Sequence, residues 1–476
     1  MMSKLRKIPL LVISVLLAAG NLFAQHQELG EKPSIWQEKN KQKNDTTSLL
    51  HAFKNGTMQG HIRYFFMATE NTNDLSDYYA NALGGGIKFV TAPIKGFQLG
   101  ISGFFTFNIG SSPLGEPDPK TGAGNRYEIG LFDQQDPYNT SDIDRLEELF
   151  LKYSFKNSSI TLGKQLINTP FINLQDGRMR PTEVSGLWSE LNTGKTKWEG
   201  GLIKQIAPRG TVKWFSVEES IGIYPMGVNP DGERSAYRGN TKTKGLAMAG
   251  MTNKSLKYLT LQAWHMYVHN IFNTSMLQAD IKHPLGNNGQ LLLGLQWIEQ
   301  FRSGDGGNYL PELRYVQDKQ SGTFGAMAGW ENNQFKTTLA FNRITDKGRF
   351  LMPREWGRDP FYTFMARERN EGLASANALV STFSYKFPKT GIKTNLSMGY
   401  FDLPDAADFA RNKYGLPSYT QLNLDIRYDF KGWLQGLNTQ LLIYHKWKTE
   451  DGELDGKYLI NKVNMQGWNI VFNYYF

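Results

Sequence analysis

In the segment QLNLDIRYDF (421–430), apolar and polar residues alternate without exception. Successive side chains of a β-strand point to opposite faces, so this pattern predicts a strand with one apolar face and one polar face. The apolar face carries Leu422, Leu424, Ile426, Tyr428 and Phe430, and the polar face carries Gln421, Asn423, Asp425, Arg427 and Asp429. Such a strand needs paired neighbours and an apolar environment on one side only.

The same alternation recurs along most of the chain. It is found in MQGHIRYFFMA (58–68), GFQLGISGFFTF (96–107), LFLKYSF (149–155) and GQLLLGLQWIEQF (289–301), with turn residues between the segments. No stretch has the 3.6-residue periodicity of an amphipathic helix over three or more turns. The sequence therefore predicts an all-β fold.

Two all-β architectures compete: a soluble sandwich or propeller, and a transmembrane barrel whose outer face meets lipid. Soluble strands usually have about 5–6 residues, whereas several segments here approach the ~9–11 residues that cross a membrane. Aromatic residues gather at segment ends, as in FNYYF, IRYDF and FSYKF, where barrels place interfacial girdles. We therefore predict a transmembrane antiparallel β-barrel of about 18 strands.

The last predicted strand, NIVFNYYF (469–476), alternates up to Phe476. A closed barrel must pair its last strand with its first, because an open edge in lipid leaves backbone polar groups unsatisfied. We expect an aromatic closing strand with Phe476 in the girdle. A terminal aromatic in such a strand resembles the signal read by the barrel assembly machinery.

The N-terminal region differs in composition from the rest. Three basic residues precede an apolar run from Ile8 to about Gly20, and a small-residue cleavage site follows at Ala24. We predict a secretory signal peptide over residues 1–24, a polar periplasmic tail over 25–57, and the barrel, with inward-folded outer loops, over 58–476. The chain has no cysteine, which excludes an acylated lipoprotein, disulfides and thiolate metal sites.

Enzyme motifs are weak in this sequence. TGKT (193–196) lacks the first glycine of a P-loop, and His265 and His269 on a strand would lie about 13 Å apart, too far to share a metal ion. No G-x-S-x-G or H-E-x-x-H motif is present. We predict no catalytic residue, metal or cofactor. Two alternatives to a channel stay open: a barrel enzyme of the lipase or protease type, and a structural barrel with a plugged lumen.

Asp176, Arg178 and Arg180 lie in a proline-containing stretch between two predicted strands. Arginines in a loop folded into a narrow lumen would bind carboxylates bidentately and make a pore selective. The alternative is a solvated loop in which the aspartate and the arginines merely pair. The pattern alone does not separate these interpretations.

Basic residues also occupy the polar phase of several predicted strands. Charges facing lipid cost about 2–4 kcal/mol at the membrane midplane, so these side chains are expected to face the lumen. They form a predicted basic track along the wall, unless neighbours such as Asp425 and Asp429 compensate them. The residues are Arg63, Lys152, Lys386, Arg427 and Lys446.

The stretch from Leu162 to Trp188 resembles the OprD-type family of outer-membrane porins. That family carries a Gly-basic-Gln, Thr-Pro, Asp-x-Arg and Pro-x-x-x-x-Gly series, matched here by Gly163-Lys164-Gln165, Thr169-Pro170, Asp176-Gly177-Arg178 and Pro181 with Gly186. HAFKNGTMQGHIRYFF (51–66), REWGRDPFYTFMARERNEG (354–372) and the segments from Tyr419 to Phe476 are also similar to the family.

The resemblance implies an eighteen-stranded channel, monomeric or a homotrimer, in the outer membrane of a Gram-negative bacterium. It implies passive, selective diffusion of small hydrophilic solutes: carboxylate-bearing amino acids, peptides or organic acids, or oligosaccharides. Arg178 matches a constriction arginine of the family, and an inward loop would supply an acidic partner, for which Asp305 is our candidate. Lys164 falls on the lipid phase, and we expect it to snorkel to the interface.

Overall fold

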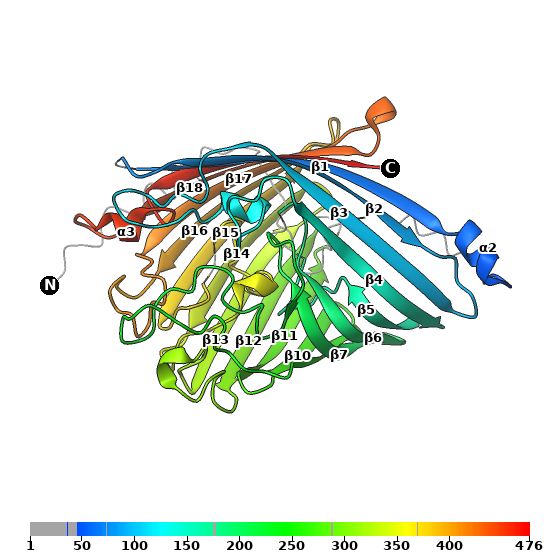
Figure 1. Cartoon of the computed structure of the whole chain (residues 1–476), viewed down its shortest axis with the longest axis horizontal. Helices are drawn as coiled ribbons and strands as arrows, with labels where there is room; N and C mark the ends of the chain where they lie inside the picture. The colour runs from blue at the N-terminus through cyan, green and yellow to red at the C-terminus, as the bar shows by residue number, and fades with distance from the viewer. Residues whose placement is uncertain (1–35, 37–44, 73, 175–177, 287–288, 369) are drawn as a thin grey trace.

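In a computed structural model, the structure describes residues 36, 45–72, 74–174, 178–286, 289–368 and 370–476. Within these residues, nineteen strands form one antiparallel sheet that closes on itself (Figure 1). One of them, β8, has two residues and pairs with the edge of β7, so eighteen strands make the barrel wall. The predicted all-β barrel is confirmed.

The strands are β1 (Thr57–Asn71), β2 (Tyr78–Val90), β3 (Phe97–Ser111), β4 (Ile143–Phe155), β5 (Ser158–Gln165), β6 (Glu183–Thr193), β7 (Thr196–Ala207), β8 (Phe215–Ser216), β9 (Leu246–Asn253), β10 (Leu259–Val268), β11 (Phe272–Pro284), β12 (Gln290–Arg302), β13 (Gln320–Glu331), β14 (Phe335–Ile344), β15 (Ala376–Lys386), β16 (Lys393–Asp402), β17 (Tyr419–Asp429), β18 (Leu437–Lys448) and β19 (Met465–Tyr475). The short helices are α2 (Leu49–Lys54), α3 (Gly456–Leu459), η1 (Glu128–Leu131), η2 (Pro311–Leu313), η3 (Arg354–Trp356) and η4 (Gly432–Leu434). Among the described residues, none of these helices is long and apolar enough to cross a membrane.

The barrel closes between β1 and β19, with His61 opposite Tyr475 and Asn71 opposite Met465. The pairing continues to the last residue, because Gly60 and Phe476 exchange two backbone hydrogen bonds of 2.9 and 3.1 Å. A Cβ on Gly60 would lie 2.2 Å from the Phe476 ring, so glycine permits the aromatic ring to cover the first strand. The predicted aromatic closing strand is therefore present.

Side chains alternate between the two faces of the wall as the sequence pattern predicts. In β17, Leu422 on the outer phase is 38% exposed, whereas Gln421 on the inner phase is 0% exposed. The outer phase of most strands carries exposed Leu, Ile, Phe, Tyr and Trp residues. A solvent-facing antiparallel sheet shows the opposite arrangement, so this exterior suits a hydrocarbon environment.

Long and short connections lie at opposite ends of the barrel. The long-loop end carries 112–142, 166–182, 208–245, 303–319, 345–375, 403–418 and 449–464, whereas the other end carries turns such as 156–157, 194–195 and 332–334. The sequence predicts long loops near 109–145, 300–320 and 345–373, and these are present. The longest connection, 208–245, is not among the predicted long loops.

The tail predicted over 25–57 carries local structure in its described part. Ser48 caps α2 by accepting a hydrogen bond from the His51 N–H, and the helix lies at the short-turn end beside β1 (Figure 1). Trp36 is buried and packs edge-on against His61, an inner-phase residue of β1, at 6.4 Å between ring centroids. One residue of the tail therefore lies inside the barrel. The predicted signal peptide lies outside the described residues.

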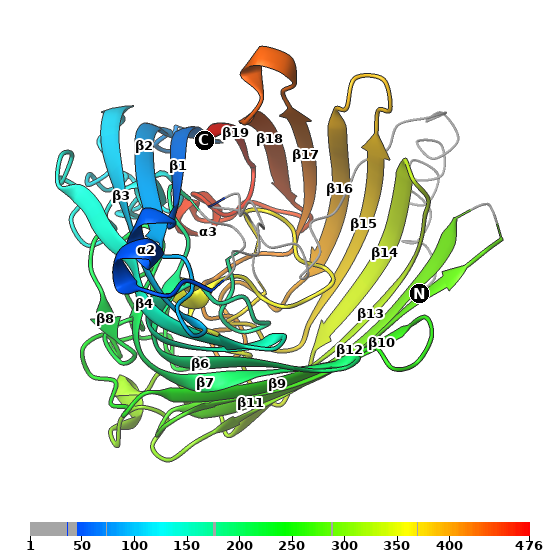
Figure 2. The ribbon, with the colours of Figure 1, turned by 90° about the vertical axis from the view of Figure 1, so that its right-hand side faces the viewer.

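The hydrophobic core of the molecule lies inside the ring of strands. Figure 2 looks along the barrel and shows non-strand segments of the chain, including yellow and red ones from the C-terminal half, crossing the interior. The largest of the three buried hydrophobic clusters among the described residues joins inner-phase strand residues such as Met266 and Ile298 to loop residues such as Phe350 and Trp356. The long loops therefore fold inward and set the shape of the lumen.

Candidate functional site

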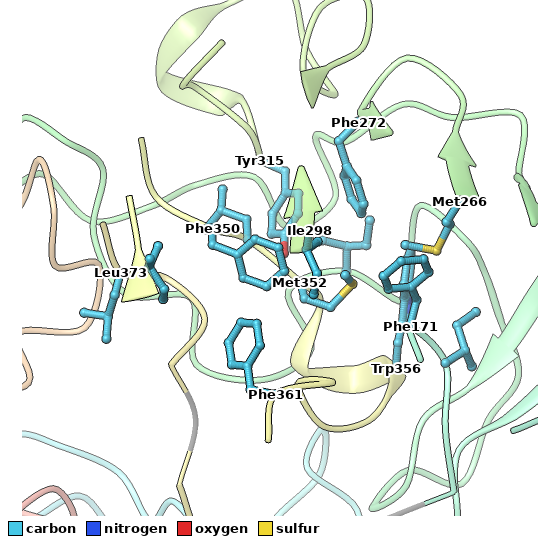
Figure 3. Close-up of a cluster of buried hydrophobic side chains, with 14 of the residues drawn as sticks. Phe171, Met266, Phe272, Ile298, Tyr315, Phe350, Met352, Trp356, Phe361 and Leu373 are labelled. Carbon is cyan, nitrogen blue, oxygen red and sulfur yellow. The ribbon is translucent and has the colours of Figure 1, made fainter. Parts of the chain in front are cut away.

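The loop 345–375 is held inside the barrel by an aromatic and aliphatic cluster (Figure 3). Phe350 and Phe361 of this loop pack at 5.4 Å between ring centroids, and Trp356 packs against Phe272 at 6.3 Å. The cluster also includes residues of β10, β12 and two other long loops, which are Met266, Ile298, Phe171 and Tyr315. Burying this many large side chains stabilises the inward conformation, since each contributes about 1.5–3 kcal/mol.

Polar side chains of the wall fix the same loop by binding its backbone. Gln296 and Gln300 of β12 donate to the Pro360 and Leu351 carbonyls at 2.8 and 2.7 Å. On the far wall, Gln421 of β17 donates to the Ala366 carbonyl at 2.9 Å. Buried backbone groups need such partners, so the inner-phase glutamines specify where the loop crosses the lumen.

Four inward loops meet at a small cavity to which they contribute five arginines. The loops are 112–142, 166–182, 208–245 and 345–375. The cavity volume is about 40 Å³, which is room for roughly one to three water molecules. Its lining residues are Arg126, Tyr127, Gly130, Gln134, Arg178, Arg209, Tyr224, Pro225, Arg354, Arg367 and Glu368. We call this set of residues the arginine pocket.

The arginine pocket combines five guanidinium groups with one carboxylate. That carboxylate, on Glu368, lies 2.9 Å from the ammonium of Lys446 in β18. Arginine is the residue best suited to bind carboxylates, because its planar fork matches their two oxygens. The chemistry of the lining therefore favours an anionic occupant.

A second acidic residue close to the pocket is Glu128, which follows Tyr127 in η1. Thr69 Oγ1 and Asn125 Nδ2 each donate to its carboxyl at 2.6 Å. Burial raises the pKa of Glu128 above its usual value in spite of these hydrogen bonds. The protonated form is therefore favoured more than in water, and Glu128 compensates the nearby arginines less than an exposed glutamate would.

The structure places Arg178, one of the predicted constriction residues, in the arginine pocket. Arg178 is 6% exposed, and its Nε lies 3.5 Å from the position of a Cβ built on Gly130, which is ordinary packing distance. Arg63 on the inner face of β1 is near enough to interact electrostatically with Arg178. Asp176 lies outside the described residues.

The structure places Arg180 elsewhere, in a charged cluster against the wall. Its guanidinium donates to the Thr211 and Ile143 carbonyls at 3.1 and 3.3 Å, and its Nε lies 3.7 Å from Glu147 Oε1. Burial and the nearby Arg145 lower the pKa of Arg180 to about 10. Arg180 stays charged at neutral pH and anchors the start of β6 to β4, but it does not line the pocket.

The residues of the predicted basic track have different environments. Lys152 lies on the inner phase of β4, and Lys386 is exposed at the short-turn end of β15. Arg427 pairs with Asp425 of the same strand at 2.8 Å, so neighbour compensation applies there. Lys446 is fully buried and holds Glu368. Of the five, the geometry associates Arg63 and Lys446 with the pocket.

Asp305 and Lys164 lie away from the arginine pocket. Asp305 is exposed in the loop 303–319, where its backbone N–H donates to Asn270 Oδ1 at 2.9 Å. Lys164 is on the outer phase of β5, and its Nζ lies 4.4 Å from the centre of the Trp214 ring. The acid that the structure brings to the pocket is Glu368 instead.

Four arginines of the pocket were not singled out from the sequence: Arg126, Arg209, Arg354 and Arg367. They lie on loops, where no periodicity assigns a direction to a side chain. One usable signal was present, because the segment 354–372 holds four arginines, two of them within ARER (366–369). Among the described residues, no group of three or more His, Asp or Glu side chains is placed to hold a metal ion.

Comparison with known proteins gives a family and a set of similar folds. The family model described as "outer membrane porin, OprD family" matches residues 121–390. No curated protein sequence matches the chain. Among solved structures, Pseudomonas aeruginosa OccK9 (OpdG) aligns with a TM-score of 0.70 at 12% identity, covering 89% of this chain and 99% of that one.

Two further structures give similar values. Acinetobacter baumannii OccAB3 aligns with a TM-score of 0.68 at 14% identity, and Pseudomonas aeruginosa OpdK, solved with vanillate, aligns with a TM-score of 0.68 at 12% identity. Each alignment covers 89% of this chain and 99% of the other. At these identities the likeness concerns the fold.

Proposed function

The chain belongs to the OprD family of outer-membrane porins, and on that premise we propose that its arginine pocket is the selectivity filter for small solutes that carry a carboxylate. Porins of this family are substrate-specific channels of the Gram-negative outer membrane, and passive diffusion through the barrel follows from family membership. The long-loop end then faces the outside, and the short-turn end faces the periplasm.

The observation that carries the proposal is the convergence of five arginines from four loops on one cavity of about 40 Å³. A cavity this small forces a passing solute to lose most of its water, so the wall must replace the lost hydrogen bonds. Guanidinium groups do this for a carboxylate and repel an ammonium group. Arg63 on the wall would extend the favourable potential toward the periplasm.

The comparisons give no support to the alternative of a barrel enzyme. The other alternative, a structural barrel with a plugged lumen, differs from the channel in one measurable respect, since it conducts neither ions nor solutes. Because the loops that fill the lumen also form the pocket, transport requires small movements of these loops. Flux through the folded barrel therefore separates the two readings.

The proposal is tested by liposome swelling with solutes of matched size and shape. A suitable set is benzoate, benzamide and benzylamine, together with vanillate and vanillyl alcohol, since the similar OpdK was solved with vanillate. Carboxylate uptake is expected to be the fastest in each set and to fall with added salt, because salt screens the arginines. Equal rates for acid, amide and amine would refute carboxylate selection. Absence of any ionic conductance would instead favour the plugged barrel.

We also propose that β19 is recognised by the barrel assembly machinery and that the barrel works as a monomer or a homotrimer. The first part is tested by deleting Phe476, which should lower the yield of heat-modifiable barrel in the outer membrane and leave secretion to the periplasm intact. The second is tested by cross-linking in intact membranes, where one band or a ladder to three subunits is expected.

A further inference from the structure

The loop 403–418, between β16 and β17, buries a lysine under three tyrosine rings. Lys413 is 2% exposed, and its Nζ lies 4.8, 5.0 and 5.4 Å from the ring centres of Tyr237, Tyr315 and Tyr414. Nζ also donates to the Tyr237 hydroxyl at 3.1 Å. An ammonium group over an aromatic face is attracted by the ring's electrons, and more strongly when water is excluded. We call the three rings the lysine cage.

Three long loops form the lysine cage, and the backbone of Lys413 links it to a fourth. Tyr237 belongs to the loop 208–245, Tyr315 to 303–319, and Lys413 with Tyr414 to 403–418. The backbone of Lys413 accepts a hydrogen bond from the Val228 N–H and donates one to the Gly372 carbonyl of the loop 345–375, each at 2.9 Å.

The glycine beside the cage is required by its geometry. Gly372 has a φ of +86°, and a Cβ there would lie 2.6 Å from the ring of Tyr414 and 3.1 Å from Lys413 Cβ. Only glycine adopts this conformation without strain and leaves room for the ring. The contact between the loops 345–375 and 403–418 is therefore close-packed at the cage.

Tyr414 connects the cage to the arginine pocket. Its ring has Lys413 Nζ at 5.4 Å and the guanidinium carbon of Arg354 at 5.1 Å. Its hydroxyl donates to Glu371 Oε1 at 2.5 Å, and the same oxygen lies 3.8 Å from Arg354 Nε. The ring of Tyr414 and the carboxylate of Glu371 thus hold the guanidinium of Arg354 in the pocket lining.

We propose that Lys413 is a positioning residue of the channel: by filling the lysine cage it holds Tyr414, and through Tyr414 it places Arg354 in the arginine pocket. The inference rests on the proposed function, since it concerns the same pocket. It adds that the loop 403–418, which contributes no residue to that pocket, controls the pocket's shape from the outer mouth.

The charge of Lys413 makes the cage sensitive to pH. Burial is the main cause that lowers the pKa of Lys413 from 10.5 to about 8; Glu371 and Glu355 oppose the shift, and Arg349 and Arg354 add to it. The three tyrosines of the cage complete its titratable surroundings, and burial raises the pKa of each of them well above 10.0. They therefore stay neutral through the pH range of interest.

The direction of the pH effect follows from proton linkage. When the cage opens, Lys413 enters water and regains a pKa near 10.5. Between about pH 8 and 10.5 the open cage binds a proton that the closed cage does not, so opening becomes about tenfold less frequent per pH unit. Below pH 8 both states are protonated, and opening is most frequent and independent of pH. Alkaline conditions therefore keep the cage shut.

The experiment compares three variants as folded, heat-modifiable barrels. Lys413→Ala empties the cage, and we expect the ratio of benzoate to benzamide uptake to fall about threefold, with larger current fluctuations in planar bilayers. Lys413→Met refills the cage without a charge, and we expect a wild-type uptake ratio. Lys347→Ala is the matched control, because Lys347 is a half-exposed loop lysine whose Nζ pairs with Glu299 of β12 at 3.2 Å and forms no cation–π pair with the three rings of the cage.

The pH profile gives a readout that a purely structural role would not move. In wild type and in Lys347→Ala, the frequency of current fluctuations should be constant from pH 6.5 to 7.5 and fall between pH 8 and 9.5. In Lys413→Met it should be low and flat. Lys462 of the neighbouring loop, whose Nζ donates to the Gly415 carbonyl at 3.3 Å, has a pKa lowered by burial to about 7. Lys462→Met is therefore recorded in parallel and should retain the fall above pH 8.

Two results would overturn the inference: a wild-type uptake ratio in Lys413→Ala, or a wild-type pH profile in Lys413→Met. If Lys413→Ala does not fold, Tyr414→Leu removes the ring between the two cations and must lower the uptake ratio in the same way. If the wild-type protein shows no carboxylate preference, the proposed function is refuted but the role of the cage is not. The pH profile of the ionic current still tests the cage.

Discussion

The ammonium of Lys446 lies 2.9 Å from the carboxylate of Glu368, and the two side chains are 0% and 3% exposed. Lys446 Nζ also donates to the Arg367 carbonyl at 2.8 Å. Lys446 of β18 therefore binds the loop 345–375 at Arg367 and Glu368, two residues that the loop contributes to the arginine pocket. The ammonium charge of Lys446 thus holds the carboxylate of Glu368 in its position in the pocket lining.

Lys446→Met should destabilise the folded barrel by about 3–5 kcal/mol, because Glu368 would be left buried without its partner. The loop 345–375 should also loosen, which appears as larger current fluctuations. The double variant Lys446→Met/Glu368→Gln should recover most of the stability, since no unpaired charge remains. Unfolding by urea in detergent or bilayers measures both effects, and equal losses in the single and double variants would argue against the pairing.

Arg178→Ala should remove one carboxylate-binding fork from the arginine pocket and widen it. Ionic conductance is then expected to rise or stay constant, while benzoate uptake falls about tenfold, as for the loss of a hydrogen bond to a charged group. Arg411→Ala is the control, because Arg411 is 53% exposed in an ion pair with Asp408. Such pairs contribute about 0–1 kcal/mol, so both quantities should match wild type. Unchanged uptake in Arg178→Ala would place selection elsewhere.

Arg427 and Asp425 form a compensated pair on the inner wall, joined by hydrogen bonds of 2.8 to 3.2 Å. Removing either partner exposes the charge of the other to the lumen. Arg427→Ala should shift ion selectivity toward cations, and Asp425→Asn should shift it toward anions, without abolishing substrate selection. Reversal potentials in a salt gradient measure both shifts. Unchanged reversal potentials in both variants would show that the pair does not face the permeation path.

Asp118 links two outer connections, since its carboxylate accepts hydrogen bonds from the backbone and hydroxyl of both Ser76 and Thr121. Burial alone would raise the pKa of Asp118, but these hydrogen bonds lower it from 3.8 to about 2. The link is therefore fully present above the unfolded-state pKa near 4 and is lost as the pH falls through about 2.

We expect proteolysis of the loop 112–142 by an acid-stable protease to accelerate below about pH 3 in wild type. Asp118→Asn should show the faster cleavage at every pH, because a neutral amide accepts these hydrogen bonds less strongly. A variant with wild-type cleavage rates at pH 5 would disprove the role of this carboxylate.

The wall could be derived from the sequence because strand periodicity is a local property. The alternation in 421–430 predicts the inner position of Arg427 and the outer position of Leu422, and the lipid environment leaves few other arrangements. The loops obey no such rule. Whether Arg354 points inward depends on its contacts with Glu371, which is 17 residues further along the same loop, and with Tyr414, which belongs to another loop.

The pocket was therefore only partly predictable. Arg178 was identified because a short motif resembles the OprD family, whereas Arg126 and Arg209 lie in stretches without a recognised motif. Arg180, two residues from Arg178, anchors the wall instead, because its guanidinium meets the Thr211 carbonyl and Glu147. The spacing of two arginines in a loop does not determine which of them reaches the lumen.

The seam between β1 and β19 has a consequence for the order of folding. Along the rest of the described wall, strands pair with neighbours that follow closely in the chain, so hairpins can form with little loss of loop entropy. At the seam, His61 and Asn473 are 412 residues apart and meet through a hydrogen bond of 3.0 Å. A barrel assembled hairpin by hairpin would therefore reach the membrane as an open, curved sheet with two unpaired edges. The slow step would be the pairing of β1 with β19. A protein that pairs temporarily with one of the open strand edges would accelerate it.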